Sequence, residues 1–474
     1  MVCSLFGLCL IGYIGYIILT NKNPKKLLSK MIVLTAVCSL NIRMGYMLKI
    51  GNSVVGFSSI LVYLTGLISL LLIVQKKKVP RKLTIAVVGM ILILGLGACR
   101  NIILPYKKSV VTGNWTDYVL GKNVESYISG QSLQIGYYLV LSFIGLILIA
   151  SDILLDEYDF WDVLADVIKY SKISIIVGYV EYVTKNFFHS RIITDLFIAF
   201  FGNQGAQQNL LVDRGGHFAV QGATKESSMF TTVLFYIAIM LIVDYAKNKS
   251  SKNKKWLFGC VFLLVLNPAV SSIVYLGILG LVWISYKDIL GVKKFSGIKI
   301  GRIVLVVFVI AIIGWSIISN ADTMLNSNNY LLKRVGISIQ QLQIIVSGAG
   351  TLMYSSEAIR LSGIVYDLKL LAERPLLGFG LGSVSCNSGV VTMLVNAGIL
   401  GFVAWYYTIN RYMNIEKSLS EAVFSIYIVI FPSVFLNDYE TIFCIIIPIV
   451  LRCFKYLGIS NYAARTIKSK CVKG

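Results

Sequence analysis

The chain has 474 residues, of which 57% are hydrophobic and only 14% are charged. This composition is more apolar than a soluble globular protein needs, and apolar runs near the ~20 residues that cross a bilayer recur from end to end. It excludes a series of soluble domains and predicts an all-α, polytopic integral membrane domain that occupies residues 1–474.

The net charge of +22 comes mostly from lysines in short clusters between apolar runs. A nucleic-acid-binding protein needs a basic groove with interleaved aromatic residues, and no such groove is encoded here, so we expect no nucleic-acid partner. The nine cysteines show no Cys-x-x-Cys spacing, which argues against a disulfide framework or a zinc site. The first residues lack the basic region of a cleaved signal peptide, so we expect a retained first span.

The basic clusters set the orientation of the expected membrane spans. Clusters at 22–26 and 76–82 follow the first and third apolar runs, so we expect them in the cytoplasm and the N-terminus outside. Continuing this alternation gives about 13 spans. In chain order they are about 2–20, 31–48, 54–74, 83–104, 133–150, 173–188, one starting directly after 228, two within 256–286, 303–319, 389–409 and two flanking 437–440.

Three parts of this plan need comment. The run 256–286 has basic clusters on both sides, so we expect it to turn back at 267–272 as two short spans or a re-entrant hairpin. The acidic link 152–172 fits a cytoplasmic helix lying on the membrane surface, with solvated carboxylates in preference to a metal site. Glu181 lies inside the sixth span and needs an ionic partner or a cavity.

We expect three long segments outside: a polar loop at 105–131, a smaller loop at 189–226 and a large loop at 320–388. In the large loop, helical spacing predicts an amphipathic helix that ends before Pro375 and leads into a Gly-x-Gly-x-Gly turn. Arg360, Asp367 and Arg374 recur every seven residues along the edge of its apolar stripe. The expected stripe consists of Leu361, Ile364, Val365, Leu368, Leu371 and Ala372.

Cationic residues gather on the outer side of this plan. They are Arg43, Arg100, Arg214, His217, Arg360 and Arg374. Each arginine alone can equally be an interfacial anchor, but as a set they suit a lipid pyrophosphate, because guanidinium groups stay charged and bind phosphate in bidentate fashion. Glu226, at the outer mouth of the seventh span, can then accept a proton from an attacking sugar hydroxyl. His217 is equally interpretable as a local hydrogen-bonding residue.

Two short motifs resemble the O-antigen polymerase family of bacterial surface-polysaccharide enzymes, which is related to the O-antigen ligases. Glu373-Arg-Pro-Leu-Leu-Gly-Phe-Gly-Leu-Gly, followed by Asn396-Ala-Gly-Ile-Leu-Gly401, looks like the family signature at the end of the large periplasmic loop. Arg214-Gly-Gly-His-Phe with Glu226-Ser-Ser looks like the motif of the earlier loop, with Ser227 in place of a proline, and Arg43-Met-Gly-Tyr is also similar.

The sequence also departs from the family pattern. Ligases carry a His-Asn pair near the end of the large loop, and this chain has Cys386-Asn387 there. Some polymerases have a glycine eleven residues after the arginine of each loop; here those positions are Lys225 and Leu371. The missing histidine argues against a ligase.

The resemblance implies a metal-independent glycosyltransferase, without cofactor, in the bacterial cytoplasmic (inner) membrane. It would polymerise undecaprenyl-pyrophosphate-linked repeat units into O-antigen (lipopolysaccharide) or capsular polysaccharide at the outer face, with a lipid-open cavity. Its partners would be the lipid-linked glycan donor and acceptor, membrane lipids and a chain-length regulator protein. Glu226, Arg214 and Arg360 would be catalytic, and the substrate-binding residues would be Arg43, His217, Arg374 and Asp367.

Two alternatives remain open. One is an O-antigen ligase, which shares nearly all of these requirements. The other, from a different class, is a lipid-linked oligosaccharide flippase, which needs two pseudo-equivalent halves. No internal repeat is evident in the sequence.

Overall fold

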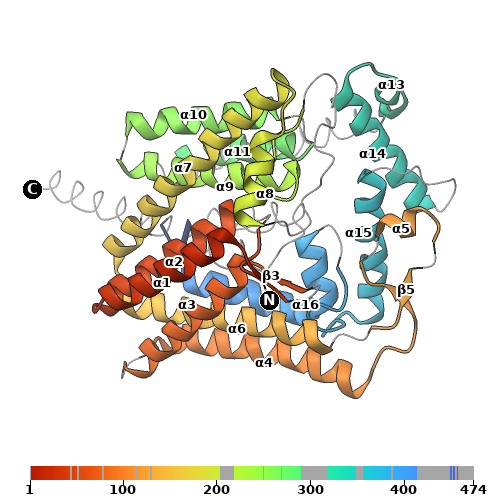
Figure 1. The fold of residues 1–474 in the computed structure, drawn as a ribbon. Coiled ribbons are helices and arrows are strands. Elements are labelled where there is room, and N and C mark those ends of the chain that lie inside the picture. Colours follow the sequence, from red (N-terminus) through yellow and green to blue (C-terminus); the bar gives the residue numbers. More distant parts are fainter. Residues whose placement is uncertain are drawn as a thin grey trace, which may run out of the picture.

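The chain forms a bundle of helices with a few short strands among its connections (Figure 1). The computed structural model describes residues 2–42, 45–50, 53–76, 79–113, 115–122, 124–128, 131–202, 218–248, 250–267, 270–289, 319–347, 356–385, 388–413, 449–450, 452–453 and 456. The first eight helices are α1 Leu5–Thr20, α2 Pro24–Asn41, α3 Phe57–Val74, α4 Arg81–Ile103, α5 Trp115–Val119, α6 Gln131–Leu154, α7 Glu157–Asn186 and α8 Ile192–Phe201. The later ones are α9 Ser227–Asn248, α10 Ser251–Leu266, α11 Val270–Ile289, α13 Ala321–Leu325, α14 Tyr330–Ser347, α15 Ser356–Glu373 and α16 Gly389–Met413.

Two small antiparallel sheets accompany the helices. The first has the order β1-β2-β3, from β1 Val2–Cys3, β2 Leu48–Ile50 and β3 Ser53–Val55, with Cys3 opposite Leu48 and Leu48 opposite Val55. The second pairs β4 Val110–Val111 with β5 Glu125–Ser126. Strands β2 to β5 lie in connections that we expect outside or at their edges, and β1 lies at the start of the expected first span, so the all-α prediction holds for the bundle and misses these strands.

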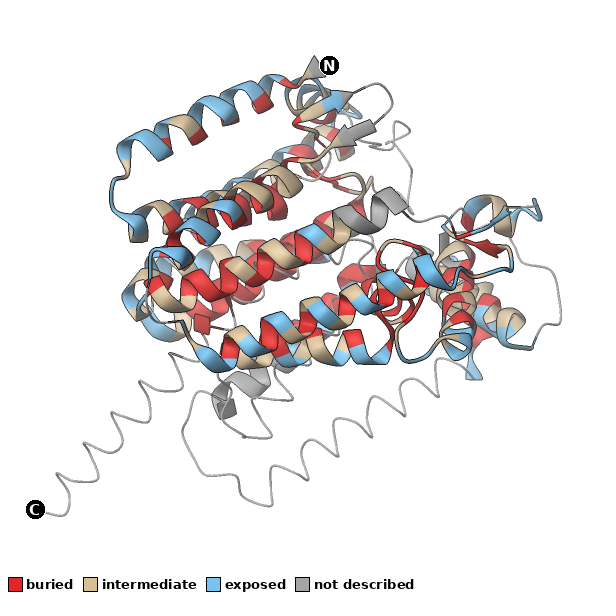
Figure 2. Ribbon diagram, turned by 90° about the horizontal axis from the view of Figure 1, so that it is seen from below, coloured by how far each residue is buried: buried red, intermediate tan, exposed pale blue. Residues whose placement is uncertain are grey.

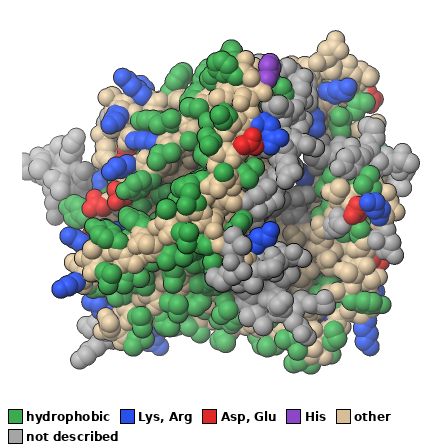
Figure 3. Space-filling view, in the orientation of Figure 1, with side chains coloured by type: hydrophobic (Ala, Val, Ile, Leu, Met, Phe, Trp, Pro, Cys, Tyr) green, Lys and Arg blue, Asp and Glu red, His purple; other side chains and the backbone are tan. Residues whose placement is uncertain are grey.

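Among the described residues, five helices are long and apolar enough to cross a membrane: α3, α4, α6 over Tyr137–Leu154, α9 and α16 over Gly389–Tyr412. Shorter apolar helices cover Leu5–Thr20, Ile192–Phe201 and Ser271–Gly280. Hydrophobic side chains also cover much of the surface over α1, α3 and α4, where Leu8, Leu71 and Leu92 are more than half exposed (Figure 3). An apolar surface of this extent is typical of a membrane protein. The expected spans at 303–319 and around 437–440 lie outside the described residues.

The helix ends sort into two groups. The turns α1–α2, α3–α4, α6–α7 and α9–α10 lie at the left end of the bundle in Figure 1, whereas α5, β5 and α13 to α15 lie at the right end. The lysine clusters at 22–26 and 76–82 belong to the left-hand turns. This is the arrangement that alternating spans with cytoplasmic basic turns would produce.

Helix α9 is the centre of the larger core. Its residues from Phe230 to Val243 are buried, and α7, α10 and α11 pack around it. A helix that is apolar on every side belongs in the interior, which explains why α9 shows no polar face. In Figure 2 the buried residues likewise lie along the sides of helices that face their neighbours.

Two expectations about the helices in this region have clear outcomes. The turn within 256–286 is confirmed, because α10 and α11 are separate helices that both pack on α9. The separate surface helix over 152–172 is wrong, because α7 runs unbroken for 30 residues from Glu157 into the sixth span. A capping box between Asp156 and Asp159 starts α7, and no Gly or Pro interrupts it before Gly178.

Two loop boundaries also differ from expectation. The second span was expected over 31–48, but α2 starts seven residues earlier, with Pro24 at its first turn, and ends at Asn41 before strand β2. The smaller outer loop contains the apolar helix α8, because residues 192–201 have enough hydrophobic residues to pack against α1 and α7.

Candidate active site between two outer segments

Glu226, Ser228 and Arg360 meet where the N-terminal end of α9 contacts α15. Arg360 Nη2 lies 3.4 Å from Glu226 Oε1 and donates to Ser228 Oγ over 3.3 Å, and the Ser228 hydroxyl donates to the Glu226 carboxylate. The side chain of Arg360 is 40% exposed and that of Glu226 26% exposed. Two catalytic residues predicted from different loops, 134 positions apart, therefore form one accessible cluster.

The start of α9 gives Glu226 a favourable electrostatic setting. Its carbonyl accepts from the N–H groups of Met229 and Phe230, so its carboxylate lies at the positive end of the helix dipole. The Thr224 hydroxyl donates to the carbonyls of Gln221 and Glu226 and shapes the turn that precedes the helix. Arg360, the Ser228 hydroxyl and the N-terminus of α9 therefore all adjoin this carboxylate.

The loop that leads to Glu226 is held by side-chain amides that sequence reasoning missed. Asn186 binds both backbone groups of Phe218, accepting from its N–H over 2.7 Å and donating to its carbonyl over 3.1 Å. Asn267 likewise accepts from the Val220 N–H over 3.2 Å and donates to the Val220 carbonyl over 3.1 Å. Both asparagines stand at the end of apolar helical segments, where a side-chain amide can form hydrogen bonds with the backbone of a neighbouring loop. Their position at these helix ends is the sequence signal that could have identified them.

Arg374 lies apart from this cluster. Its guanidinium donates to Asn101 Oδ1 over 3.3 Å and to the Leu104 carbonyl over 3.1 Å, and it stacks on the rings of Tyr106 and Phe379. Burial, followed by the positive charge of the nearby Arg100, lowers the pKa of Arg374. In this structure the residue expected to bind substrate ties the turn after α15 to the end of α4.

Asp367 is fully buried in α15, so it does not line an open surface. The predicted apolar stripe of this helix is wrong, because Leu368 is 45% exposed while Ser362 and Asp367 are enclosed. Helix α15 packs on α5, α14 and α16, and these neighbours decide which of its faces is covered. Helical periodicity identified the helix correctly, and Pro375 placed its end at Arg374, one residue after the last residue of α15.

The glycine motif forms a turn that fits into a break in α16. Gly398 has φ +68° inside α16, and the N–H groups of Ile399 and Leu400 bond to the carbonyls of Pro375 and Leu376. In return, the N–H groups of Phe379 and Gly380 bond to the carbonyls of Val395 and Asn396. The turn and the helix therefore exchange backbone hydrogen bonds.

The glycines permit this close approach. An added Cβ at Gly378 would lie 2.4 Å from the Val395 carbonyl oxygen, and one at Gly398 would lie 2.2 Å from that of Leu376. Both residues also have positive φ, which disfavours any other side chain. The motif that resembles a family signature thus has a structural role of its own.

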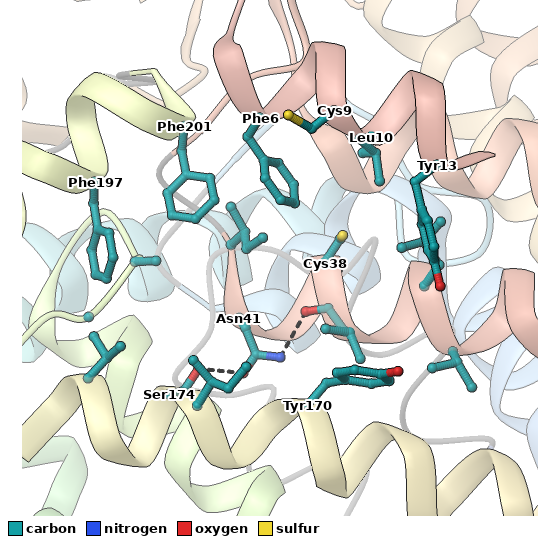
Figure 4. A pocket seen from close by; sticks show the side chains of 18 of the residues that line it. Phe6, Cys9, Leu10, Tyr13, Cys38, Asn41, Tyr170, Ser174, Phe197 and Phe201 are labelled. Carbon is teal, nitrogen blue, oxygen red and sulfur yellow. Dashed lines mark hydrogen bonds between the residues drawn. The ribbon is translucent and has the colours of Figure 1, made fainter. Parts of the chain in front are cut away.

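A cavity of about 500 Å³ lies between α1, α2, α7 and α8. Phe6, Phe197 and Phe201 line its upper part, as Figure 4 shows, and Asn41 and Ser174 supply a hydrogen-bonded polar pair at 2.6 Å. Gly222 and Ala223 of the loop before Glu226 also line it. The cavity therefore joins an apolar space between helices to the segment that carries the carboxylate.

Several predicted residues lie outside the described residues: Arg43, Arg214, His217, Cys386 and Asn387. Glu181 has the partner that its position requires, because it pairs with Lys185 one helical turn further on. Within the described ranges, no group of three or more His, Cys, Asp and Glu side chains could hold a metal ion. No family model matches the chain, and no curated protein matches it.

Proposed function

We propose that the chain is a polysaccharide polymerase that joins undecaprenyl-pyrophosphate-linked repeat units at the outer face of the bacterial cytoplasmic membrane. The observation that carries the proposal is the contact between Glu226 and Arg360. A carboxylate that can accept a proton, at the end of the smaller outer segment, and a guanidinium that can bind a phosphate, within the large one, lie together.

In the proposed reaction, Glu226 takes the proton from a hydroxyl at the nonreducing end of the acceptor glycan. The hydroxyl oxygen attacks the anomeric carbon of the donor, and the bond from that carbon to the pyrophosphate oxygen breaks. Undecaprenyl pyrophosphate leaves with the bonding electrons, and Arg360, joined by Arg214 and Arg43, stabilises its negative charge. The activated donor supplies the driving force, so no nucleotide is needed.

The cluster of Glu226, Ser228 and Arg360 allows Arg360 to leave Glu226 and bind the pyrophosphate instead. The pair between Arg360 and Glu226 is long, at 3.4 Å, and partly exposed, so it contributes little to stability. A pyrophosphate with two or more negative charges can draw Arg360 away. Glu226 then keeps its hydrogen bond from Ser228 and becomes available as the base.

The apolar cavity supports a lipid-linked substrate. Its aromatic and aliphatic lining suits an isoprenoid chain, and it reaches Gly222 and Ala223, which precede Glu226 by four and three residues. A lipid held there would bring its headgroup toward the cluster. The same cavity would serve the donor whose sugar is transferred.

A gel of surface glycans after deletion of the gene tests this function. Loss of a polymerase leaves single repeat units at the cell surface, whereas loss of a flippase leaves no units there. Loss of a ligase leaves long chains on the lipid carrier that are not transferred to their final acceptor. Complementation with the wild-type chain should restore long polymer, and a deletion strain that still makes it would refute the proposal.

A further inference from the structure

Glu181 and Lys185 form a buried ion pair on α7. The distance from Lys185 Nζ to Glu181 Oε1 is 2.5 Å, and both side chains are only 1% exposed. Buried ion pairs contribute little net stability by themselves, because desolvation offsets their attraction. The contacts of this pair with the neighbouring loop therefore need an explanation.

The carboxylate of Glu181 binds the loop through consecutive backbone groups. Its Oε2 accepts from the N–H of Gly222 over 2.6 Å and from that of Gln221 over 3.3 Å. Its Oε1 also accepts from the Thr194 hydroxyl of α8 over 3.4 Å. Lys185 Nζ donates to the Ala219 carbonyl over 3.4 Å.

These contacts lie next to the hydrogen bonds that Asn186 and Asn267 form with the backbone of Phe218 and Val220. Together, the four side chains bind every residue of the loop from 218 to 222. Gly222 then passes so close to α9 that an added Cβ would lie 2.6 Å from the Phe230 ring. Only Ala223, Thr224 and Lys225 separate this fixed segment from Glu226.

We propose that Glu181 and Lys185 are positioning residues that fix the loop 218–226 and so set the place of the Glu226 carboxylate beside Arg360. A carboxylate is required because it can accept from two successive N–H groups while it pairs with Lys185. A glutamine has one acceptor oxygen, and its NH2 group would face another donor. We call these hydrogen bonds from Glu181 and Lys185 to residues 219–222 the clamp. Its effect on turnover rests on the proposed polymerase function, whereas its existence does not.

The test uses the full-length protein and three sets of variants. Glu181→Ala removes the acceptor. The double variant Glu181→Gln with Lys185→Met removes both charges at nearly constant volume, so it leaves no buried charge without its partner. Arg191→Gln with Asp195→Asn neutralises a partly exposed ion pair of the same i,i+4 spacing and serves as the matched control.

Two readouts are measured on each variant: hydrogen exchange of the peptide 218–226 in purified protein, and polymer yield in a deletion strain, corrected for protein abundance. We expect faster exchange and roughly 100-fold less polymer per molecule in the double variant, because a displacement near 1 Å can cost that much in rate. The control should match wild type in both.

Unchanged exchange of 218–226 in the double variant would overturn the clamp. Faster exchange with unchanged polymer yield would overturn the positioning role. If the wild-type chain makes no polymer, the proposed function fails, and hydrogen exchange still decides whether the clamp exists.

Discussion

At the scale of single residues, the contact between Glu226 and Arg360 is too exposed to be a stability device. Exposed ion pairs contribute about 0.2–1 kcal/mol to the free energy of unfolding. In this pair the side chain of Glu226 is 26% exposed and that of Arg360 is 40% exposed. We therefore expect removal of this ion pair to reduce activity while hardly changing the stability of the fold.

Arg360→Ala should leave one repeat unit per lipid carrier while the melting temperature of the purified protein barely changes. The reason is loss of the cation that stabilises the leaving pyrophosphate. Gel analysis of glycans and a thermal melt check the two halves of this statement. Arg191→Ala, at an exposed pair, is the control; long polymer from the Arg360 variant would contradict the assignment.

Glu226→Gln should lower the rate of chain extension by about 10²–10⁴-fold, because an amide of the same shape cannot accept the proton from the acceptor hydroxyl. Ser228→Ala leaves the carboxylate in place and should have a much smaller effect. The measurement is the rate of polymer formation from lipid-linked repeat units by purified protein. Equal rates for wild type and the glutamine variant would exclude Glu226 as the base.

At the scale of elements, the turn after α15 and the break in α16 depend on each other. Gly398→Ala should destabilise the protein by more than ~2 kcal/mol, since its φ is +68° and its Cβ would meet a backbone oxygen. Gly12→Ala is the matched control, because nothing lies within 4 Å of its added Cβ in α1. Thermal melting of both variants in detergent measures the difference; similar melting temperatures would argue against the interlock.

A second element contact, at the end of α15, should depend on pH. Hydrogen bonds from Tyr106 and then Lys108 lower the pKa of Glu373 below its usual 4.5. The folded state thus favours the ionised carboxylate, and its stabilisation is present above pH 4.5 and disappears as the pH falls through the lower folded pKa.

The melting temperature of Glu373→Gln should accordingly lie slightly below that of wild type at pH 7 and coincide with it in strong acid. Thermal melts across this pH range provide the measurement. A difference that persists unchanged below the folded pKa would show that the ionised carboxylate is not its source.

At the scale of the whole molecule, the sequence predicts the helices better than their contacts. Apolar runs between basic clusters located α3, α4 and α9, and two basic flanks predicted the turn between α10 and α11. The partners of the polar side chains were harder to predict, because they depend on which helices pack against one another in the fold. The i,i+4 spacing of Glu181 and Lys185 was a readable signal, whereas nothing local to Arg374 indicates Asn101 as its partner.

The orientation of the bundle can be tested directly. A short epitope inserted at Gly121, whose surroundings are open, should be labelled by antibody on intact spheroplasts. One inserted between α9 and α10 should be labelled only after permeabilisation, because it adjoins the lysines that we expect in the cytoplasm. Labelling in the reverse pattern would invert the proposed topology and move Glu226 and Arg360 to the cytoplasmic side.

The hydrogen bonds exchanged at Gly398 also bear on how the protein is made. In a regular helix the N–H groups of Ile399 and Leu400 would bond to the carbonyls of Val395 and Asn396, four residues earlier, so without the turn α16 would satisfy these groups by closing the break at Gly398. The turn that holds this break open lies just ahead of α16 in the chain, so it is synthesised first. The turn is therefore already present when α16 is made, and the helix can take its broken form as soon as it folds.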